Sequence, residues 1–119
     1  MALFGIGRKH HGQRHYAARP ADTFAAVLAA TARDDSGFTQ KDHDAAHHVV
    51  ELTSKGSRLT YGDRFTVSFA PATGGTLVKV EGAGATEFAA TSSARMQKEF
   101  DRLFSEVYAE LRRDKKFIG

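Results

Sequence analysis

The stretch that decides the fold runs from residue 50 to residue 80 and reads VELTSKGSRLTYGDRFTVSFAPATGGTLVKV. Large apolar residues occupy every second position along most of it, namely Val50, Leu52, Leu59, Tyr61, Phe65, Val67, Phe69, Val78 and Val80. Thr, Ser, Arg and Lys fill most of the positions between them. This period-two alternation predicts strands with one buried face and one face in water.

Two glycine-containing turns keep the alternation in phase. In a two-residue hairpin, the residues that flank the turn pair with each other and face the same way. A turn at residues 55–56 would pair Ser54 with Ser57, and so join the even apolar positions of the first strand to positions 59 and 61. A turn at 74–75 would join positions 65, 67 and 69 to positions 78 and 80. A turn at 62–63 would break the phase, so we expect residues 58–70 to form one strand.

Helical patterns lie on either side of this sheet. Pro20 opens a helix that ends near Arg33, since proline is tolerated in the first helical turn. A second helix starts at a cap among residues 91–93 and carries an apolar stripe at helical spacing. The stripe consists of Met96, Phe100, Leu103, Phe104, Val107 and Leu111. Residues 13–18 and 38–41 complete the pattern as two further strands.

The element order is therefore β-α-β-β-β-β-α. We expect an α+β fold, with an antiparallel sheet of four to five strands and two helices packed on one face. At 119 residues the chain is long enough for one core. Residues 13–119 are predicted to form a single domain, and residues 1–12, with three glycines and several basic residues, a flexible N-terminal arm.

The element order resembles the TATA-binding-protein-like fold, as in small uncharacterised bacterial families. It is also similar, less closely, to the helix-grip fold of START and plant-allergen-like proteins, which has more strands. The resemblance covers about residues 13–114 and rests on element order, without a signature motif. It implies a fold and assigns no functional residue.

Composition narrows the class of protein. The chain has no cysteine, which excludes disulfides, thiolate metal sites and a cysteine nucleophile. We see neither a secretory peptide nor a membrane-spanning segment and expect a cytoplasmic protein. The net charge of +3 is mild, and most of the excess lies near the two ends of the chain. A nucleic-acid-binding protein often has a denser basic stripe.

The wet face of the sheet is the first candidate site. It should carry basic and hydroxyl side chains, which suit a ligand or a partner: Arg58, Thr60, Arg64, Thr66, Ser68 and Lys79. Nearby glutamates dilute its positive charge. In the TATA-binding protein the corresponding face grips DNA with basic residues and inserted aromatic rings. Such aromatic rings are not expected on this face here.

A histidine-rich segment is a weak metal candidate. His43 and His47 are four residues apart and are followed by His48, with Asp42 and Asp44 beside them. Spacing fixes no third ligand, so we predict no metal site and no cofactor. The sequence contains no phosphate-binding loop and no nucleophile motif, and we expect the protein not to be an enzyme.

The sequence thus favours a non-catalytic binding module that uses the open sheet face or the groove under the C-terminal helix. Its partner is an unknown protein or small molecule. One alternative is a nucleic-acid-binding protein that uses the sheet face and the basic arm. A second is a helix-grip-like small-ligand or cyclase-type enzyme, which requires an enclosed pocket lined by apolar and convergent polar groups. Free sheet edges and the apolar residues 1–6 also predict a homodimer.

Overall fold

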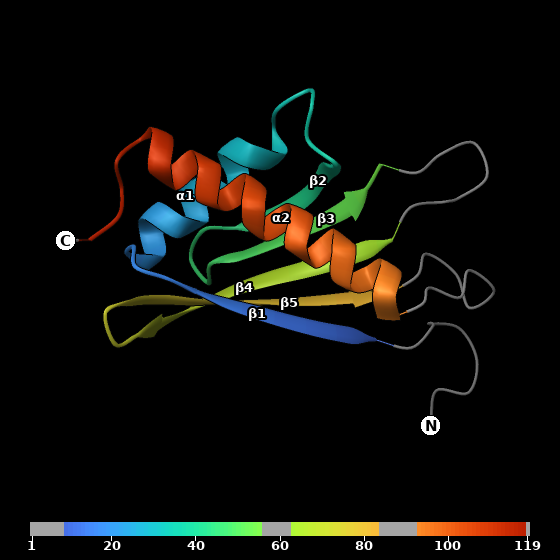
Figure 1. Cartoon of the computed structure of the whole chain (residues 1–119), viewed down its shortest axis with the longest axis horizontal. Helices are drawn as coiled ribbons and strands as arrows, with labels where there is room; N and C mark the ends of the chain where they lie inside the picture. Colours follow the sequence, from blue (N-terminus) through green and yellow to red (C-terminus); the bar gives the residue numbers. More distant parts are fainter. Residues whose placement is uncertain (1–8, 56–62, 84–92, 119) are drawn as a thin grey trace.

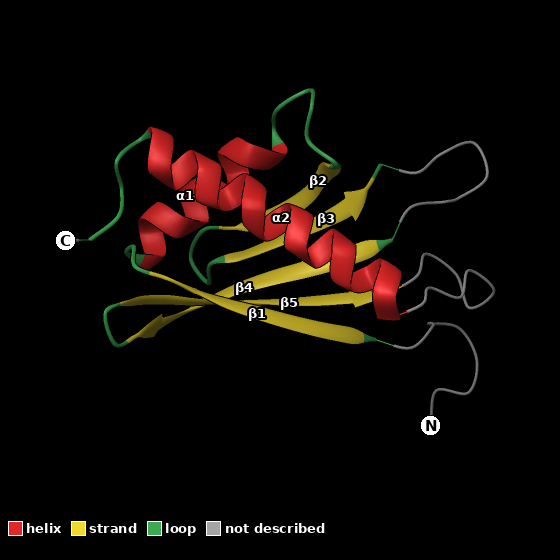
Figure 2. Cartoon of the chain, in the orientation of Figure 1, coloured by secondary structure: helices red, strands yellow, loops and turns green. Residues whose placement is uncertain are grey.

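The computed structural model describes residues 9–55, 63–83 and 93–118. Its elements follow the predicted order, and the chain is an α+β protein (Figure 2). In chain order they are β1 (His10–Tyr16), α1 (Pro20–Thr31), β2 (Phe38–Asp44), β3 (Val49–Ser54), β4 (Arg64–Ala72), β5 (Gly75–Ala83) and α2 (Ser93–Arg113).

The five strands form one antiparallel sheet with the order β1-β5-β4-β3-β2. Strands β2 to β5 follow one another as hairpins, whereas β1 joins the far side of β5. Both helices lie on the same face of the sheet, and α2 runs diagonally over it (Figure 1). Strands β1 and β2 are the outer strands, and the homodimer expected through free edges stays a prediction.

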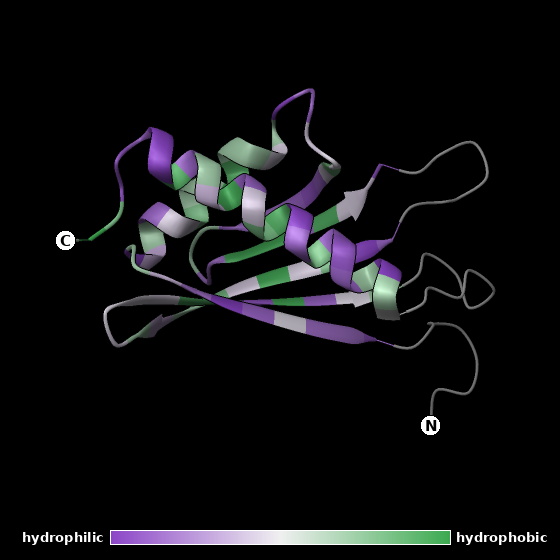
Figure 3. Ribbon diagram, in the orientation of Figure 1, coloured by the Kyte–Doolittle hydropathy of each residue, from purple (hydrophilic) through white to green (hydrophobic). Residues whose placement is uncertain are grey.

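The core lies between the helices and the sheet, and the predicted phase is confirmed. Five alternating positions of β4 and β5 are at most 9% exposed: Phe65, Val67, Phe69, Val78 and Val80. The apolar stripe of α2 covers them, and each of its six residues is at most 1% exposed. Between these positions, Thr66 and Lys79 are exposed on the other face. Apolar segments accordingly alternate with polar ones along both helices and strands (Figure 3).

The first predicted turn is wrong in its register. Leu52 pairs with Phe65, and the Ser54 N–H donates to Asp63 O at 2.8 Å, so this hairpin closes on Asp63 rather than on Ser57. The Asp63 N–H donates to Ser54 Oγ at 2.7 Å. Positions 59, 61, 65 and 67 are all odd and so share one phase of the alternation. The alternation alone therefore could not show which of these positions pair with β3. Of the predicted strand 58–70, residues 58–62 lie outside the described residues.

The second predicted turn is shifted by one residue. Ala72 pairs with Gly75, so Thr73 and Gly74 form the turn. Gly74 has φ 75°, a left-handed conformation that glycine adopts without steric cost. The predicted and the observed register both place positions 65, 67 and 69 on the same face as positions 78 and 80. The buried face was therefore predicted correctly although the turn was not. Pro71 lies beyond the last β3–β4 pair, where the missing N–H breaks no bond to β3.

Three element boundaries also differ from the prediction. β1 spans His10–Tyr16 rather than 13–18, and its first residues fall within the stretch expected to be an arm. α1 begins at Pro20 as predicted and ends at Thr31. β2 continues to Asp44 through an irregularity between Gln40 and Asp42, where a turn or bulge was expected. Among the described residues, no helix combines the length and the apolarity that crossing a membrane requires.

Candidate functional site

The open sheet face collects four of the predicted site residues: Arg64, Thr66, Ser68 and Lys79. The other two, Arg58 and Thr60, lie outside the described residues. Glu51 and Glu81 flank Thr66 on the neighbouring strands, and Glu81 forms an ion pair with Lys9 at 3.1 Å. Two hollows of about 280 and 410 Å³ follow this face. Glu51 and Glu81 lie among its basic side chains and offset part of their positive charge.

In the described part of the chain, the histidine segment belongs to no group of three or more His, Asp or Glu side chains that could hold a metal ion. His47 Nδ1 lies 2.7 Å from Asp44 Oδ2 at the exposed end of the β2–β3 hairpin. His48 instead stacks on Phe24, with 5.1 Å between the ring centroids. The neighbouring ring of His43 lies 6.3 Å from the same phenylalanine. These contacts assign part of the segment to packing.

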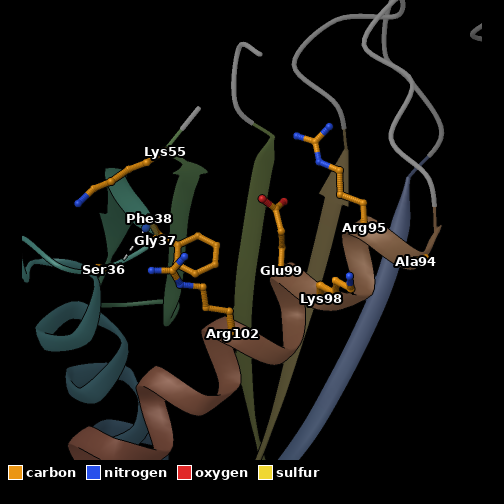
Figure 4. Close-up of a pocket in the computed structure, with 9 residues that line it drawn as sticks. All are labelled: Ser36, Gly37, Phe38, Lys55, Ala94, Arg95, Lys98, Glu99 and Arg102. Atoms are coloured by element: carbon orange, nitrogen blue, oxygen red, sulfur yellow. Dashed lines mark hydrogen bonds between the residues drawn. The ribbon is translucent and has the colours of Figure 1, made fainter. Parts of the chain in front are cut away.

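A pocket of about 580 Å³ lies at the opposite end of the helix layer from the C-terminus (Figure 4). We call it the α2 pocket. The α1–β2 loop, the end of β3 and the first half of α2 form its walls. Its lining residues are Ser36, Gly37, Phe38, Lys55, Ala94, Arg95, Lys98, Glu99 and Arg102.

The loop wall of the pocket is fixed to α2 by a single glutamate. Glu106 accepts hydrogen bonds from Ser36 Oγ at 2.7 Å and from the Gly37 N–H at 3.1 Å. Arg102 Nε also donates to Glu106, at 3.1 Å. A Cβ at position 37 would lie 2.6 Å from Arg102 Nε, so glycine allows this close approach. The wall is therefore held in place without any ligand.

Basic side chains dominate the charge of the pocket. Lys55, Arg95, Lys98 and Arg102 line it together with one carboxyl group, Glu99. Arg95 Nη2 lies 3.3 Å from Asp63 Oδ2. Phe38 supplies an apolar surface at the base of the pocket. The lining therefore combines an apolar wall with cationic groups, as in sites for small organic anions.

Glu99 is the unusual titratable group of the pocket. It projects from α2 toward the ends of β3 and β4, where Asp63 is only 2% exposed (Figure 4). Burial raises the pKa of Glu99 to about 7, helped by a hydrogen bond that the protonated side chain donates to Asp63 and by the charge of that carboxylate. Arg95 and a hydrogen bond from Ser54 act in the opposite direction. Glu99 can therefore hold or release a proton near neutral pH.

The interior beneath α2 is filled by side chains. The ring of Phe100 is 1% exposed and lies directly over the sheet. A Cβ at Gly12 would lie 2.7 Å from that ring, and a Cβ at Gly82 would lie 2.8 Å from Met96 Sδ. The two glycines thus let α2 lie close to the sheet, and the α2 pocket opens beside this packed region rather than inside it.

Sequence reasoning named the groove under the C-terminal helix as one possible site but assigned none of the residues of this pocket. Its residues come from three segments that are distant along the chain, and no motif links them. One signal was present, because Arg95, Lys98 and Arg102 recur at a spacing of three and four residues, which places them on one side of a helix. That spacing could have marked a basic helix face before the structure was known.

Comparisons with known proteins support the fold but not a family. No known protein family matches the sequence, and a search of curated proteins finds no relative. Among solved structures, Ara h 8.0201 is similar with a TM-score of 0.64 at 14% identity, over 86% of this chain and 95% of that one. An aromatase/cyclase from Streptomyces sp. R1128 has a TM-score of 0.64 at 10% identity, over 89% and 94%. A major latex protein family member from Arabidopsis thaliana has a TM-score of 0.56 at 13% identity, over 89% and 94%.

These structures share the helix-grip type of α+β fold, in which a sheet wraps around a long C-terminal helix. The chain therefore has a helix-grip-like fold. The closer resemblance expected from element order, to the TATA-binding-protein-like fold, is not confirmed. Element order could not separate the two folds, because each has a helix after the first strand and another at the end.

Proposed function

We propose that this protein binds a small organic ligand in the α2 pocket. The pocket geometry carries this proposal: a preformed volume of about 580 Å³ has Phe38 at its base and polar side chains, among them Glu99 and Arg102, in its lining. Such combinations of an apolar wall and a few convergent polar groups are typical of small-molecule sites. One structure of similar fold is that of an aromatase/cyclase, which agrees with a small organic ligand.

The open sheet face supports the proposal less well than the pocket does. Its two hollows are smaller, and carboxylates lie among its basic groups. A large ligand or a nucleic acid on that face would have to bury Glu51 and Glu81 against its own groups. Because desolvating a charge without a partner is costly, this favours the α2 pocket as the primary site.

Two fluorescent dyes of one aromatic skeleton test the proposal: 8-anilinonaphthalene-1-sulfonate and its uncharged parent N-phenyl-1-naphthylamine. We expect at least one to bind and to shift the backbone NMR signals of Gly37, Lys55 and Glu99, with those of Thr66 and Lys79 unchanged. Signal changes confined to the sheet face, or no binding of either dye, would overturn the proposal.

A pocket-filling variant and its control locate the dye. Ala94→Trp places a bulky ring at the pocket wall and should abolish binding. Gln97→Trp puts the same ring on an exposed position of the same helix that does not line the pocket, and should leave binding unchanged. If both variants retain full affinity, the dye binds elsewhere.

A second candidate function, a cyclase-type enzyme, rests on Glu99. A carboxyl group with a pKa of about 7 in a cationic pocket can take a proton from a carbon next to a carbonyl group. The electron pair of the broken C–H bond then forms an enolate, whose oxygen the basic side chains of the pocket stabilise. Return of a solvent-derived proton from Glu99 to that carbon completes the exchange.

Deuterium exchange into 2-tetralone, a bicyclic ketone with acidic C–H bonds, tests this activity. In D2O we expect the protein to speed the exchange, and Glu99→Gln to remove most of the acceleration. Glu51→Gln, on the open sheet face, is the matched control and should keep the wild-type rate. Equal rates for wild type and Glu99→Gln would exclude Glu99 as the base and leave ligand binding as the function.

A further inference from the structure

We propose that the α2 pocket selects an anionic ligand group, held by Arg102 in a lining to which Lys55 and Lys98 add positive charge, and that binding takes up a proton at Glu99. This inference rests on the proposed function, since it names the class of ligand and a control on its binding. The class is a small organic acid, that is, an aromatic or aliphatic body with a carboxylate, sulfonate or phosphate group.

The charges around the pocket are only partly compensated. Arg95 pairs with Asp63 and Arg102 with Glu106. Lys55 Nζ donates to the backbone oxygen of Asp34 at 2.9 Å, which leaves its positive charge unneutralised. Lys98 has no ion-pair partner among the residues that the structure describes. With Glu99 protonated, the lining therefore carries an excess of positive charge.

Arg102 provides the directional part of this site. It already donates to Glu106 Oε2 and, through Nη2, to Asp35 O at 3.4 Å, so its guanidinium lies along the loop wall at the pocket. A guanidinium has five N–H donors in a fixed plane, and two bonds leave others for an anion. Lys55 lies on the same side of the pocket as the loop, whereas Lys98, one turn before Arg102 on α2, points toward Ala94 and contributes charge rather than a shared contact (Figure 4).

Glu99 is placed so that its charge opposes a bound anion. It lies on α2 between Arg95 and Arg102, in the same lining. Its Oε2 atom is buried. Burial disfavours the charged form, and the neutral acid donates a hydrogen bond to Asp63. The buried carboxylate of Asp63, packed behind it, acts in the same direction.

The groups that face Glu99 come from several elements, and each raises or lowers the pKa of its carboxyl group. Asp63 raises its pKa, whereas Arg95 and the Ser54 hydroxyl lower it, and burial is the largest effect. Lys55, Lys98 and Arg102 complete the charged surroundings. A ligand anion adds a negative charge and so raises the pKa of Glu99 further. By linkage, the affinity for the anion then falls as Glu99 ionises.

The test compares the two dyes at pH 6 and pH 8. The sulfonate of 8-anilinonaphthalene-1-sulfonate stays ionised at both values, whereas N-phenyl-1-naphthylamine stays neutral. We expect the sulfonate to bind more tightly than the neutral dye at pH 6 and to lose about tenfold in affinity by pH 8. The neutral dye should show no such loss.

Glu99→Gln separates this linkage from other protonations. A pH dependence that arises from any other group of the protein would survive the substitution. We expect Glu99→Gln to bind the sulfonate at pH 8 as tightly as wild type does at pH 6. Glu51→Gln, the matched control on the sheet face, should keep the wild-type pH dependence.

A lysine pair tests the positive charge of the lining. Lys98→Gln should weaken sulfonate binding about tenfold and leave the neutral dye unaffected, while Lys79→Gln on the sheet face should change neither. If both dyes bind the pocket equally and independently of pH, this inference is wrong and the proposed function stands. If neither dye binds the pocket, both fail. An unchanged pH dependence in Glu99→Gln would overturn the role of Glu99 alone.

Discussion

Two glutamates on α2, three helical turns apart, have opposite electrostatic surroundings. Glu99 lies in the α2 pocket beside the buried carboxylate of Asp63, and its pKa is raised to about 7. Glu110 is 5% exposed near the other end of the helix. Burial alone would raise its pKa, but hydrogen bonds from Arg33 and from Arg113 at 2.7 Å outweigh this and hold the pKa below its usual range.

Burial raises the pKa of both glutamates and is the largest effect at Glu99, so the difference between the two lies in their partners. At Glu110 two guanidinium groups outweigh burial and hold a carboxylate that ties the α1–β2 loop to α2. At Glu99 an acidic neighbour leaves a proton that can be exchanged near neutral pH. One glutamate of α2 therefore stabilises the packing of the helix. The other is the residue that we propose takes up a proton when a ligand binds.

The largest expected effect comes from the segment of α2 that connects these two ends. Phe104 is 1% exposed, and Tyr16 lies against it with 6.5 Å between ring centroids. Phe104→Ala should cost about 3–5 kcal/mol of unfolding free energy, because it removes buried surface and leaves a cavity. Urea unfolding measures this loss, and a cost below about 1 kcal/mol would show that the helix is not seated on the sheet as described.

A smaller loss is expected when the structural glutamate is neutralised. Glu110→Gln leaves Arg33 and Arg113 without their carboxylate and should cost about 2 kcal/mol at pH 7. In wild type this contribution is present above the pKa of an unfolded glutamate and is lost as the pH falls through the lower folded pKa. Unfolding curves recorded from pH 7 down to pH 3 should therefore converge for the two proteins. Parallel curves would contradict the assignment.

The same substitution at Glu99 should have the opposite sign. The folded pKa of Glu99 exceeds the unfolded one, so wild type loses stability as the pH rises from about 4.5 through about 7. Glu99→Gln should remove this penalty and gain about 1–2 kcal/mol at pH 8, after allowance for solvent screening of a partly exposed group. Thermal unfolding across this range measures the gain. A loss of stability at pH 8 would mean that the carboxylate form is favoured.

The smallest effect is expected on the open sheet face. Lys79 is exposed there and pairs with Ser68 in the sheet register. Lys79→Gln should change the unfolding free energy by less than about 0.5 kcal/mol, as is usual for exposed positions without special contacts. Urea unfolding would detect a larger change, which would indicate that this face has electrostatic importance comparable to that of the helix layer.

The sequence predicted the fold best in the segments where buried and exposed positions alternate regularly. Positions such as Val67 and Val80 alternate with polar residues over whole strands, and this repetition predicts the buried face even where a turn is misplaced. The register depended on single backbone bonds at Ser54 and Asp63, which leave no periodic signal. The alternation placed the turn at residues 55–56, whereas the described residues pair Ser54 with Asp63.

The candidate site was predicted less well, for a physical reason. The sheet-face residues, such as Thr66, could be grouped because they share one periodic strand. The α2 pocket joins Gly37, Lys55 and Glu99, whose proximity depends on how a loop and a helix pack on the sheet. The pKa of Glu99 depends further on Asp63, from yet another segment, and no spacing along the chain encodes that contact.

The attachment of β1 has a consequence for the order of folding events. Four strands can pair through short hairpins, but β1 must find β5 across most of the chain, as His10 pairs with Gly82. Such long-range closure costs more chain entropy than a hairpin, so we expect β1 to dock after β2–β5 have paired. The Tyr16 hydroxyl, which donates to Phe104 O at 2.8 Å, reports this step. Tyr16→Phe should accelerate unfolding while leaving the folding rate nearly unchanged in stopped-flow experiments, whereas slower folding would place β1 in the nucleus.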